Sequence, residues 1–403
     1  MPIQFSAHTN LTAPTGPAAA RIASLCTLPA EHQPPWGRTP AVDEIRAQLH
    51  HNSALVNLPD IELLSRKLAS AQAGDAYVLH IGECAETFDM ATPDHIERRV
   101  RLYQSLADRL AGRTGQEVVL VARMAGQYAK PRSNAVEQLT DGIEALSYRG
   151  DAVNGRDPSA DSRRPDPQRL LAAYHRSLDT LTHMSSLTTA LHRPVFVSHE
   201  ALLRDYEEPL TRGGETPHTT SGHLVWIGDR TRRLWNWHVQ WAASISNPIA
   251  VKVGPKATGY DVFDLARALD PRHQPGRLSL ITRLGADAAA ERLAPLLRIV
   301  TEAHAPVLWQ CDPMHANTRT IDGRKTRLLP DLCDEVTAFA RTLRAAGCHP
   351  GGLHLEVTPD DVIECRESAN GTAQSDSQPP CDPRLNPDQA AALVDHFADA
   401  VTA

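Results

Sequence analysis

The stretch that decides the fold is PVLWQCDPMHANT, residues 306–318, in which an apolar run ends abruptly at polar residues. Residues 306–310 have the pattern of a buried strand, and Asp312 and His315 follow directly. A strand that is apolar on both faces is typical of a parallel sheet covered by helices. The carboxyl ends of such strands carry the chemistry of α/β enzymes. The stretch therefore predicts an enzyme with its site at that edge.

Two other apolar runs end in the same way. The run YVLHIG, residues 77–82, is followed closely by Cys84, and the run GLHL, residues 352–355, stops at Glu356. Parallel strands meet at one edge, so we expect this thiol and this carboxylate to lie near His315.

The whole chain repeats this alternation. Eight strand-like segments lie at about 77–81, 117–122, 194–198, 223–227, 249–253, 278–282, 306–310 and 352–356. Helical patterns are expected at 93–112, 134–147, 168–191, 230–245, 260–269, 286–303, 331–346 and 387–401. This order predicts a (β/α)8 barrel, with a doubly wound open sheet as the alternative. We expect one catalytic domain over residues 1–403, in which 1–50 form a partly irregular N-terminal extension.

Composition excludes several classes of protein. A net charge of -7 argues against a general binder of nucleic acid or anionic membranes, which normally carries a basic excess. No apolar run is long enough to span a membrane, and no secretory signal pattern is present. The seven cysteines show no CxxC spacing, which favours free thiols in a reducing cytoplasm. Nucleotide, hydrolase and zinc-protease motifs such as GxGxxG, GxSxG and HExxH do not occur.

Basic residues gather at the predicted strand ends. A turn at 126–133 carries Lys130, Arg132 and Ser133 ahead of an expected helix, whose free N–H groups favour an oxyanion. Further basic residues at strand ends are Arg123, Arg230, Lys252 and Arg283. Any one of them is also explained as a surface salt-bridge partner, but together they predict a phosphorylated or carboxylated ligand.

The same edge predicts a metal site. A thiolate, an imidazole and two carboxylates form a mixed donor set that suits a divalent first-row ion. The predicted ligands are Cys84, His315, Glu356 and Asp382. Singly, His315 is more often structural and Asp382 equally caps a helix, so the prediction depends on their common position. His199 and Glu200 offer acid–base groups, although a packed core histidine is equally consistent.

These motifs resemble those of the type II 3-deoxy-D-arabino-heptulosonate 7-phosphate (DAHP) synthases. The matching segments are 82–86, 123–133, 148–155, 198–202, 226–232, 252–255, 311–315, 352–356 and 381–386. The resemblance implies a (β/α)8 barrel that condenses phosphoenolpyruvate with erythrose 4-phosphate and water, at the start of aromatic biosynthesis. The remaining alternatives are a metal-dependent synthase for another aldose phosphate, such as an amino or imino sugar, and, more remotely, a non-catalytic partner protein.

The resemblance also implies roles for individual residues. Cys84, His315, Glu356 and Asp382 would bind the metal, with Mn²⁺ favoured over Co²⁺, Fe²⁺ or Zn²⁺. Arg123, Lys252 and Arg283 would hold phosphoenolpyruvate near Trp226 and Asp229. Lys130, Arg132, Ser133 and Arg230 would face the sugar phosphate. Catalytic contributions are expected from Lys130, Glu200, Lys252 and His315.

The chain departs from the family at a few places. Asp229 stands where the family more often has Glu, and Ala316 where it usually has Gly. Larger members insert a helical pair before the strand at 194–198 and have a longer N-terminal segment. The resemblance is therefore to the short, feedback-insensitive members of secondary metabolism, of the phenazine type, and implies a cytoplasmic homodimer.

Overall fold

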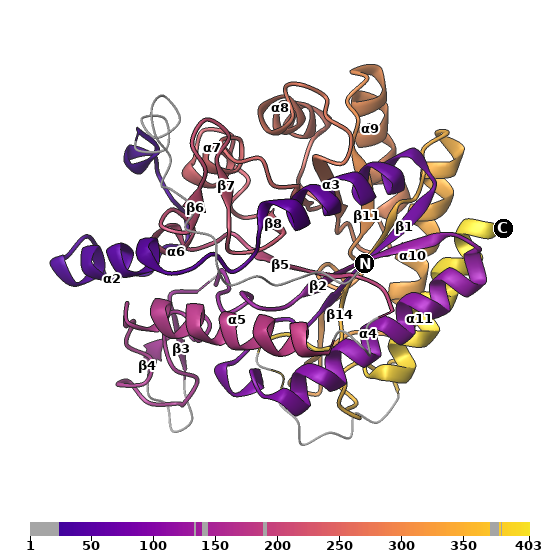
Figure 1. The fold of residues 1–403 in the computed structure, drawn as a ribbon. Coiled ribbons are helices and arrows are strands. Elements are labelled where there is room, and N and C mark those ends of the chain that lie inside the picture. Colours follow the sequence, from indigo (N-terminus) through magenta and orange to yellow (C-terminus); the bar gives the residue numbers. More distant parts are fainter. Residues whose placement is uncertain (1–23, 133, 139–143, 188–191, 371–378, 380) are drawn as a thin grey trace.

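Eight parallel strands close into a barrel (Figure 1). The computed structural model describes residues 24–132, 134–138, 144–187, 192–370, 379 and 381–403. The barrel strands, in chain order, are β1 (Ala76–Gly82), β2 (Glu117–Arg123), β5 (Val195–Glu200), β8 (Leu224–Ile227), β9 (Ile249–Val253), β10 (Leu278–Thr282), β11 (Leu308–Cys311) and β14 (Gly352–Glu356). Closure occurs where β1 pairs with both β2 and β14. The predicted barrel and all eight predicted strands are confirmed.

Helices surround the barrel on its outside (Figure 1). They are α4 (Pro93–Thr114), α5 (Arg169–Ser186), α6 (Arg204–Glu207), α7 (Trp237–Ala242), α8 (Gly259–Leu269), α9 (Ala289–Glu302), α10 (Leu329–Ala345) and α11 (Pro387–Thr402). Single 3-10 turns lie at η1 (Leu25–Thr27) and η2 (Phe88–Met90). Helix α11 fills the last gap because it packs between α4 and α10.

Alternation along the strands divides the core into two parts. Side chains such as Val78, Val121 and Phe196 belong to a cluster inside the barrel, whereas Leu79 and Val197 belong to the layer under the helices. Helix α3 (Leu58–Ala73) contributes Leu64, Leu68 and Ala71 to the inner cluster, beside the strand starts. It therefore closes the amino end of the barrel and leaves the carboxyl end for the site.

Two expectations about the helices were wrong. Residues 134–147 were expected to be helical but carry an antiparallel hairpin, β3 (Val136–Gln138) with β4 (Glu144–Leu146). A helix there would have had few apolar residues to bury, and the cross-strand bonds satisfy the backbone instead. Of residues 230–245, only α7 is helical. The extension 1–50, expected to be partly irregular, includes a regular helix, α2 (Pro40–His51), capped by Thr39, while residues 1–23 lie outside the described part.

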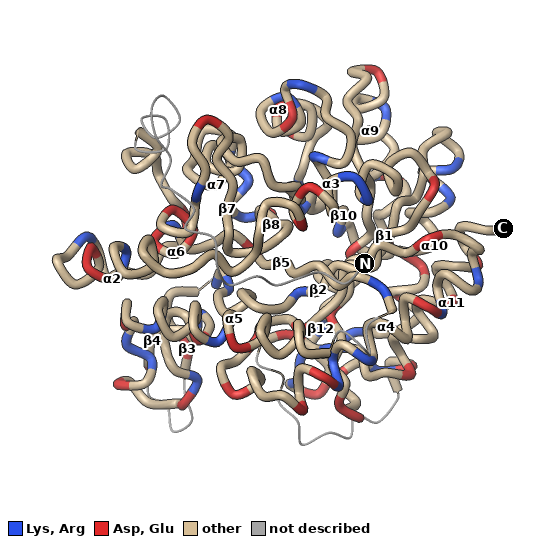
Figure 2. The backbone as a smooth tube through the Cα atoms, in the orientation of Figure 1, with Lys and Arg blue, Asp and Glu red and all other residues tan. Residues whose placement is uncertain are grey.

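Two short hairpins lie at opposite ends of the barrel. Strands β6 (Thr211–Arg212) and β7 (His218–Thr219) pair antiparallel beside the start of β9, where Thr219 bonds Asn247. Strands β12 (Arg319–Ile321) and β13 (Arg324–Thr326) pair antiparallel on the carboxyl side, after β11. Figure 2 shows Lys and Arg interspersed with Asp and Glu over the outer helices. Within the described ranges, no helix combines the length and apolar character needed to cross a bilayer.

Closure of the barrel makes Gly352 irreplaceable. Its φ is 155°, and an added Cβ would lie 2.0 Å from the carbonyl oxygen of Val78 on the paired strand. We therefore expect Gly352→Ala to lower the free energy of unfolding by at least about 2 kcal/mol, measured by urea denaturation. Gly112→Ala is the control, because nothing lies within 4 Å of its added Cβ on α4. It should instead stabilise by about 0.5–1 kcal/mol. Equal stability of the two variants would contradict this account of closure.

Candidate active site

A cleft of about 750 Å³ opens at the carboxyl end of the barrel. Its wall is built from successive strand ends: Lys130 follows β2, Glu200 ends β5, Lys252 lies in β9, Arg283 follows β10 and His315 follows β11. The cleft has the size of a small-metabolite site. Residues far apart in the sequence thus share one wall because parallel strands all end there.

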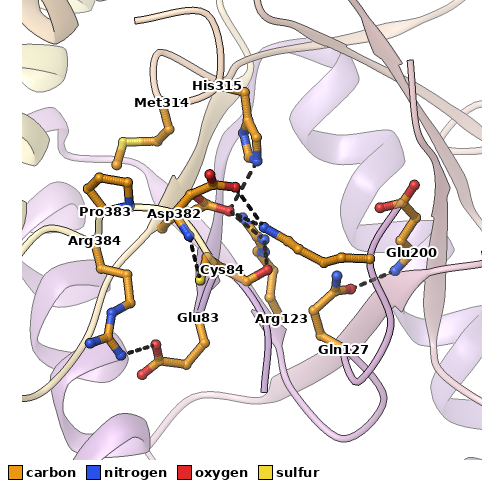
Figure 3. Close-up of polar contacts among 12 residues, drawn as sticks. Glu83, Cys84, Arg123, Gln127, Glu200, Met314, His315, Asp382, Pro383 and Arg384 are labelled. Carbon is orange, nitrogen blue, oxygen red and sulfur yellow. Dashed lines mark hydrogen bonds and ion pairs between the residues drawn. The ribbon is translucent and has the colours of Figure 1, made fainter. Parts of the chain in front are cut away.

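A group of potential metal ligands lies at one side of this cleft. The ligand atoms of His315, Glu356 and Asp382 lie within 4.8 Å of one another. The sulfur of Cys84 accepts a hydrogen bond from the backbone N–H of Asp382 at 3.5 Å, and Cys84, His315 and Asp382 lie close together in Figure 3. Three of the four predicted ligands are therefore clustered, with Cys84 adjoining them. The set fits a divalent first-row ion, since it offers imidazole, carboxylate and thiol donors.

Lys130 extends into this group. Its ammonium lies 3.2 Å from Asp382 Oδ2 and 3.6 Å from Glu356 Oε1. Burial alone would lower the pKa of Lys130, but the two carboxylates raise it above its usual value. The same ammonium is the first cause of the depressed pKa of Asp382. Lys130 therefore carries a proton and supplies positive charge to the two carboxylates.

Asp312 orients the predicted histidine ligand, a role that the sequence analysis missed. Its fully buried carboxylate lies 2.7 Å from His315 Nδ1 and 2.9 Å from Lys252 Nζ. With Nδ1 facing Asp312, the other nitrogen of His315 faces Glu356 at 3.1 Å. Carboxylates that hold the far nitrogen of a ligating histidine are the usual outer partners of metal sites. The signal was present, because Asp312 lies directly after a buried strand.

Two buried arginines hold Glu356 in place. Arg123 Nη2 donates to Glu356 Oε1 at 3.0 Å and to the Cys84 carbonyl oxygen at 3.3 Å. Arg327 Nη1 lies 2.9 Å from Glu356 Oε2. Although burial would raise it, His315, Lys130 and these arginines hold the pKa of Glu356 well below its usual range. Arg327 follows β13 rather than a barrel strand, so no pattern in the sequence pointed to it.

Arg283 is fixed at the end of β10, beside the loop that carries His315. It donates to the His315 carbonyl oxygen at 2.9 Å and pairs with Asp229 at 3.3 Å. Asp229 also accepts from the backbone N–H of Gly254 and from Arg232, both at 2.9 Å. Asp229 therefore links the loops that follow β8, β9 and β10. Lys252 is buried beside Asp312, and its burial lowers the pKa to about 8.

The predicted sugar-phosphate residues line the cleft but have other partners. Arg132 pairs with Glu137 of β3 at 3.1 Å, and Arg163 also contacts Glu137, at 2.6 Å. Arg230 donates to the Pro131 carbonyl oxygen at 3.2 Å. Ser133 lies outside the described residues. The oxyanion site expected at a helix N-terminus is wrong, because a hairpin follows this turn.

Glu200 and Trp226 occupy different depths. Glu200 lines the cleft, and its backbone N–H donates to Gln127 at 2.8 Å. Burial raises the pKa of Glu200, which makes it a stronger base. Trp226 lies within the barrel, 1% exposed, with the Arg123 guanidinium 5.3 Å from its ring centre. His199 is held by Glu207 at 2.7 Å, as a satisfied core histidine would be.

Glu335 on α10 joins the two loops that carry Arg283 and His315. Its carboxylate accepts from the backbone N–H of Leu284 and from Asn317, both at 2.7 Å. Asn317 in turn accepts from the N–H of Ala286 at 3.0 Å. Burial raises the pKa of Glu335 to about 7. One buried carboxyl group thus fixes the loop that carries Arg283 relative to the loop that carries His315.

Comparison with known proteins agrees with this geometry. The Class-II DAHP synthetase family matches residues 20–194 and 187–398. The chain belongs to this family.

Curated relatives match over nearly their whole length. One from Pseudomonas fluorescens, named "Probable phospho-2-dehydro-3-deoxyheptonate aldolase", is 42% identical, covering 91% of this chain and 94% of the relative. A "Phospho-2-dehydro-3-deoxyheptonate aldolase" of Streptomyces coelicolor is 36% identical, covering 96% of this chain and 98% of the relative. Family membership therefore applies to the whole barrel rather than to one motif.

The ligand group predicts a measurable metal affinity. Cys84→Ser should weaken Mn²⁺ binding tenfold or more in calorimetric titration, because a soft thiolate donor is lost. Cys333→Ser on α10 is the matched control and should bind like the parent protein. If Cys84→Ser bound Mn²⁺ with unchanged affinity, the thiol of Cys84 could not be a metal ligand.

Glu335 predicts a dependence of stability on pH. Its pKa is about 7 in the folded chain against 4.5 for an ordinary glutamate side chain, so the unfolded chain loses this proton at lower pH. Stability should therefore fall as pH rises from about 4.5 to 7, and Glu335→Gln should remove this contribution. Between pH 4.5 and 7, the free energy of unfolding of Glu335→Gln, measured with urea, should therefore rise by about 3 kcal/mol relative to that of the parent. Glu302→Gln, an exposed change on α9, should show no such gain; a parallel shift in both would refute the assignment.

Proposed function

We propose that this protein condenses phosphoenolpyruvate with erythrose 4-phosphate and water to give DAHP and phosphate. The observation that carries this function is a single cleft with potential metal ligands on one side and Lys252, Arg283, Arg132 and Arg230 around it. The names of the two relatives describe the same activity. A cleft with both features suits two phosphorylated substrates, one of which is an aldehyde.

The bound ion would be held by Cys84, His315, Glu356 and Asp382. When bound, a divalent metal supplies Lewis-acid activation of an aldehyde carbonyl. The mixed donor set suits divalent first-row ions generally, and among these we propose Mn²⁺. The depressed pKa values of Glu356 and Asp382 keep both carboxylates ionised and available.

The basic residues then position the reactants. Lys252 and Arg283 neutralise the charges of phosphoenolpyruvate, and Arg123 supports them from beneath the cleft. Lys130, Arg132 and Arg230 face the phosphate of the aldose. Since a charge-assisted hydrogen bond contributes more than a neutral one, these contacts both bind and orient the substrates.

The covalent steps follow from the chemistry of the two substrates. Carbon 3 of the enol attacks the aldehyde carbon, water adds to carbon 2, and the resulting hemiketal phosphate loses phosphate. Lys130, protonated and within the cleft, is the group we assign to deliver a proton to the aldehyde oxygen. Glu200, which lines the cleft and whose pKa is raised by burial, accepts a proton from the attacking water.

Other parts of the sequence-based interpretation stay predictions. These are the homodimer, the cytoplasmic location and the supply of a secondary metabolite of the phenazine type. Helix α5 ends at Ser186 and β5 begins at Val195, which leaves little room for the helical pair of larger members.

The function predicts phosphoenolpyruvate consumption with a matched aldehyde. The Mn²⁺-loaded protein should consume the enol, followed by loss of its ultraviolet absorbance, fastest with erythrose 4-phosphate among a panel of aldose, aminoaldose and iminoaldose phosphates. Arg283→Ala should raise the KM for phosphoenolpyruvate roughly tenfold or more, since a charged contact is lost. Arg298→Ala on the exposed face of α9 is the control. Faster turnover of an amino or imino sugar phosphate would favour the alternative synthase, and no consumption with any aldehyde would refute both.

A further inference from the structure

Inside the barrel, Arg123 begins a continuous series of hydrogen bonds. Its Nη1 lies 3.2 Å from His354 Nε2. The other nitrogen of His354, Nδ1, lies 3.0 Å from His80 Nδ1, and His80 Nε2 lies 2.7 Å from Ser198 Oγ. Ser198 donates to the carbonyl oxygen of Ala122 at 3.0 Å. Ala122 precedes Arg123 on β2, so the series returns to the strand where it began.

The chemistry of arginine fixes every hydrogen in this series. A guanidinium only donates, so His354 Nε2 must be the acceptor and carries no proton. The neutral ring of His354 then has its proton on Nδ1 and donates it to His80 Nδ1. That leaves the proton of His80 on Nε2, which donates to Ser198. The Ser198 hydroxyl hydrogen points to Ala122, as its distance already indicates.

The surroundings hold the two imidazoles in these orientations. His80, Ser198 and His354 are all 0% exposed. The ring of Trp226 packs edge-on against both histidines, with centroid distances of 5.3 and 5.4 Å. Because strands β1, β14 and β5 each contribute one member, the series spans the interior of the barrel. Its position therefore depends on the barrel itself and not on a loop.

We propose that His354 is a positioning residue for Arg123, and that His80 and Ser198 fix the tautomer that His354 needs. The Arg123 guanidinium has two other partners, Glu356 and the Cys84 carbonyl, both at the predicted metal site. A third bond, to His354, fixes the plane of the guanidinium. With the wrong tautomer, two N–H groups would face each other, and Arg123 would rotate away from Glu356.

The first test reads the tautomers directly, independently of activity. In ¹⁵N-histidine-labelled protein, long-range ¹H–¹⁵N spectra distinguish protonated from bare ring nitrogens. We expect His354 to be protonated at Nδ1 and His80 at Nε2, with assignments from His354→Gln and His80→Gln. A proton on Nε2 of His354 overturns the inference, whether or not the protein makes DAHP.

The second test separates positioning from simple packing. His354→Leu removes the acceptor and should weaken Mn²⁺ binding and raise the KM for phosphoenolpyruvate, each roughly tenfold or more. His354→Gln keeps an acceptor oxygen and should recover most of both. His238→Leu, which removes another buried histidine that bonds Leu202, should leave both values near those of the parent. Parent-like Mn²⁺ binding in His354→Leu overturns the proposal.

Ser198→Ala provides a milder variant should His354→Leu fail to fold. It removes the acceptor of His80 at the far end of the series, which two imidazole rings separate from Arg123 along the hydrogen bonds, although Ser198 pairs with Arg123 in register across β2 and β5. A several-fold loss of Mn²⁺ affinity is expected, and its effect should not add to that of His354→Gln, because both act through one network. Additive effects, or none, would contradict the inference. The KM readout rests on the proposed function, whereas the tautomers and Mn²⁺ affinity do not.

Discussion

The site depends on the pairing of one buried carboxylate, that of Glu356, with the cationic groups around it. It is fully buried, yet remains ionised because Arg123, Arg327, Lys130 and His315 all approach it. An unpaired buried carboxylate would be strongly disfavoured, whereas this one is surrounded by cationic or hydrogen-bonding partners. Those partners come from β2, the turn after it, the loop after β11 and the segment after β13. Much of the catalytic edge is thereby organised around a single charge.

The barrel strands fix the position of Arg123 relative to the charged carboxylate of Glu356. Parallel pairing in register places Gly82 opposite both Arg123 and Glu356, so one glycine separates the arginine from the carboxylate. Interior side chains below, Trp226 with His80 and His354, support the guanidinium on the side away from the cleft. The loops above are joined by Asp229, Asp312 and Glu335, each a carboxylate with at least two donors. Rigid strands and bracketed loops together give a preorganised site.

How much of this was readable from the sequence depends on where each residue lies. Cys84, His315 and Glu356 stand directly behind barrel strands, so the strand pattern alone placed them together. Arg327 and Glu335 lie on segments that only tertiary packing brings to the site, and no local pattern marks them. The hairpin after β2 was mistaken for a helix because hydrogen bonds between its own two short strands satisfy its backbone, and no local pattern marks that pairing. Side-chain pairs such as Arg132 with Glu137 also become visible only in the folded structure.

The pairing of Arg132 with Glu137 has a consequence for selectivity. Because Nη2 of Arg132 already donates to Glu137, a phosphate that used the same nitrogen would exchange one anion for another. A phosphate dianion competes well in that exchange because it carries more charge and more acceptor oxygens than a carboxylate. An unphosphorylated sugar would have no such charge with which to compete for that nitrogen. If Arg132 binds the substrate phosphate as proposed, Glu137 would therefore bias the cleft against neutral aldehydes.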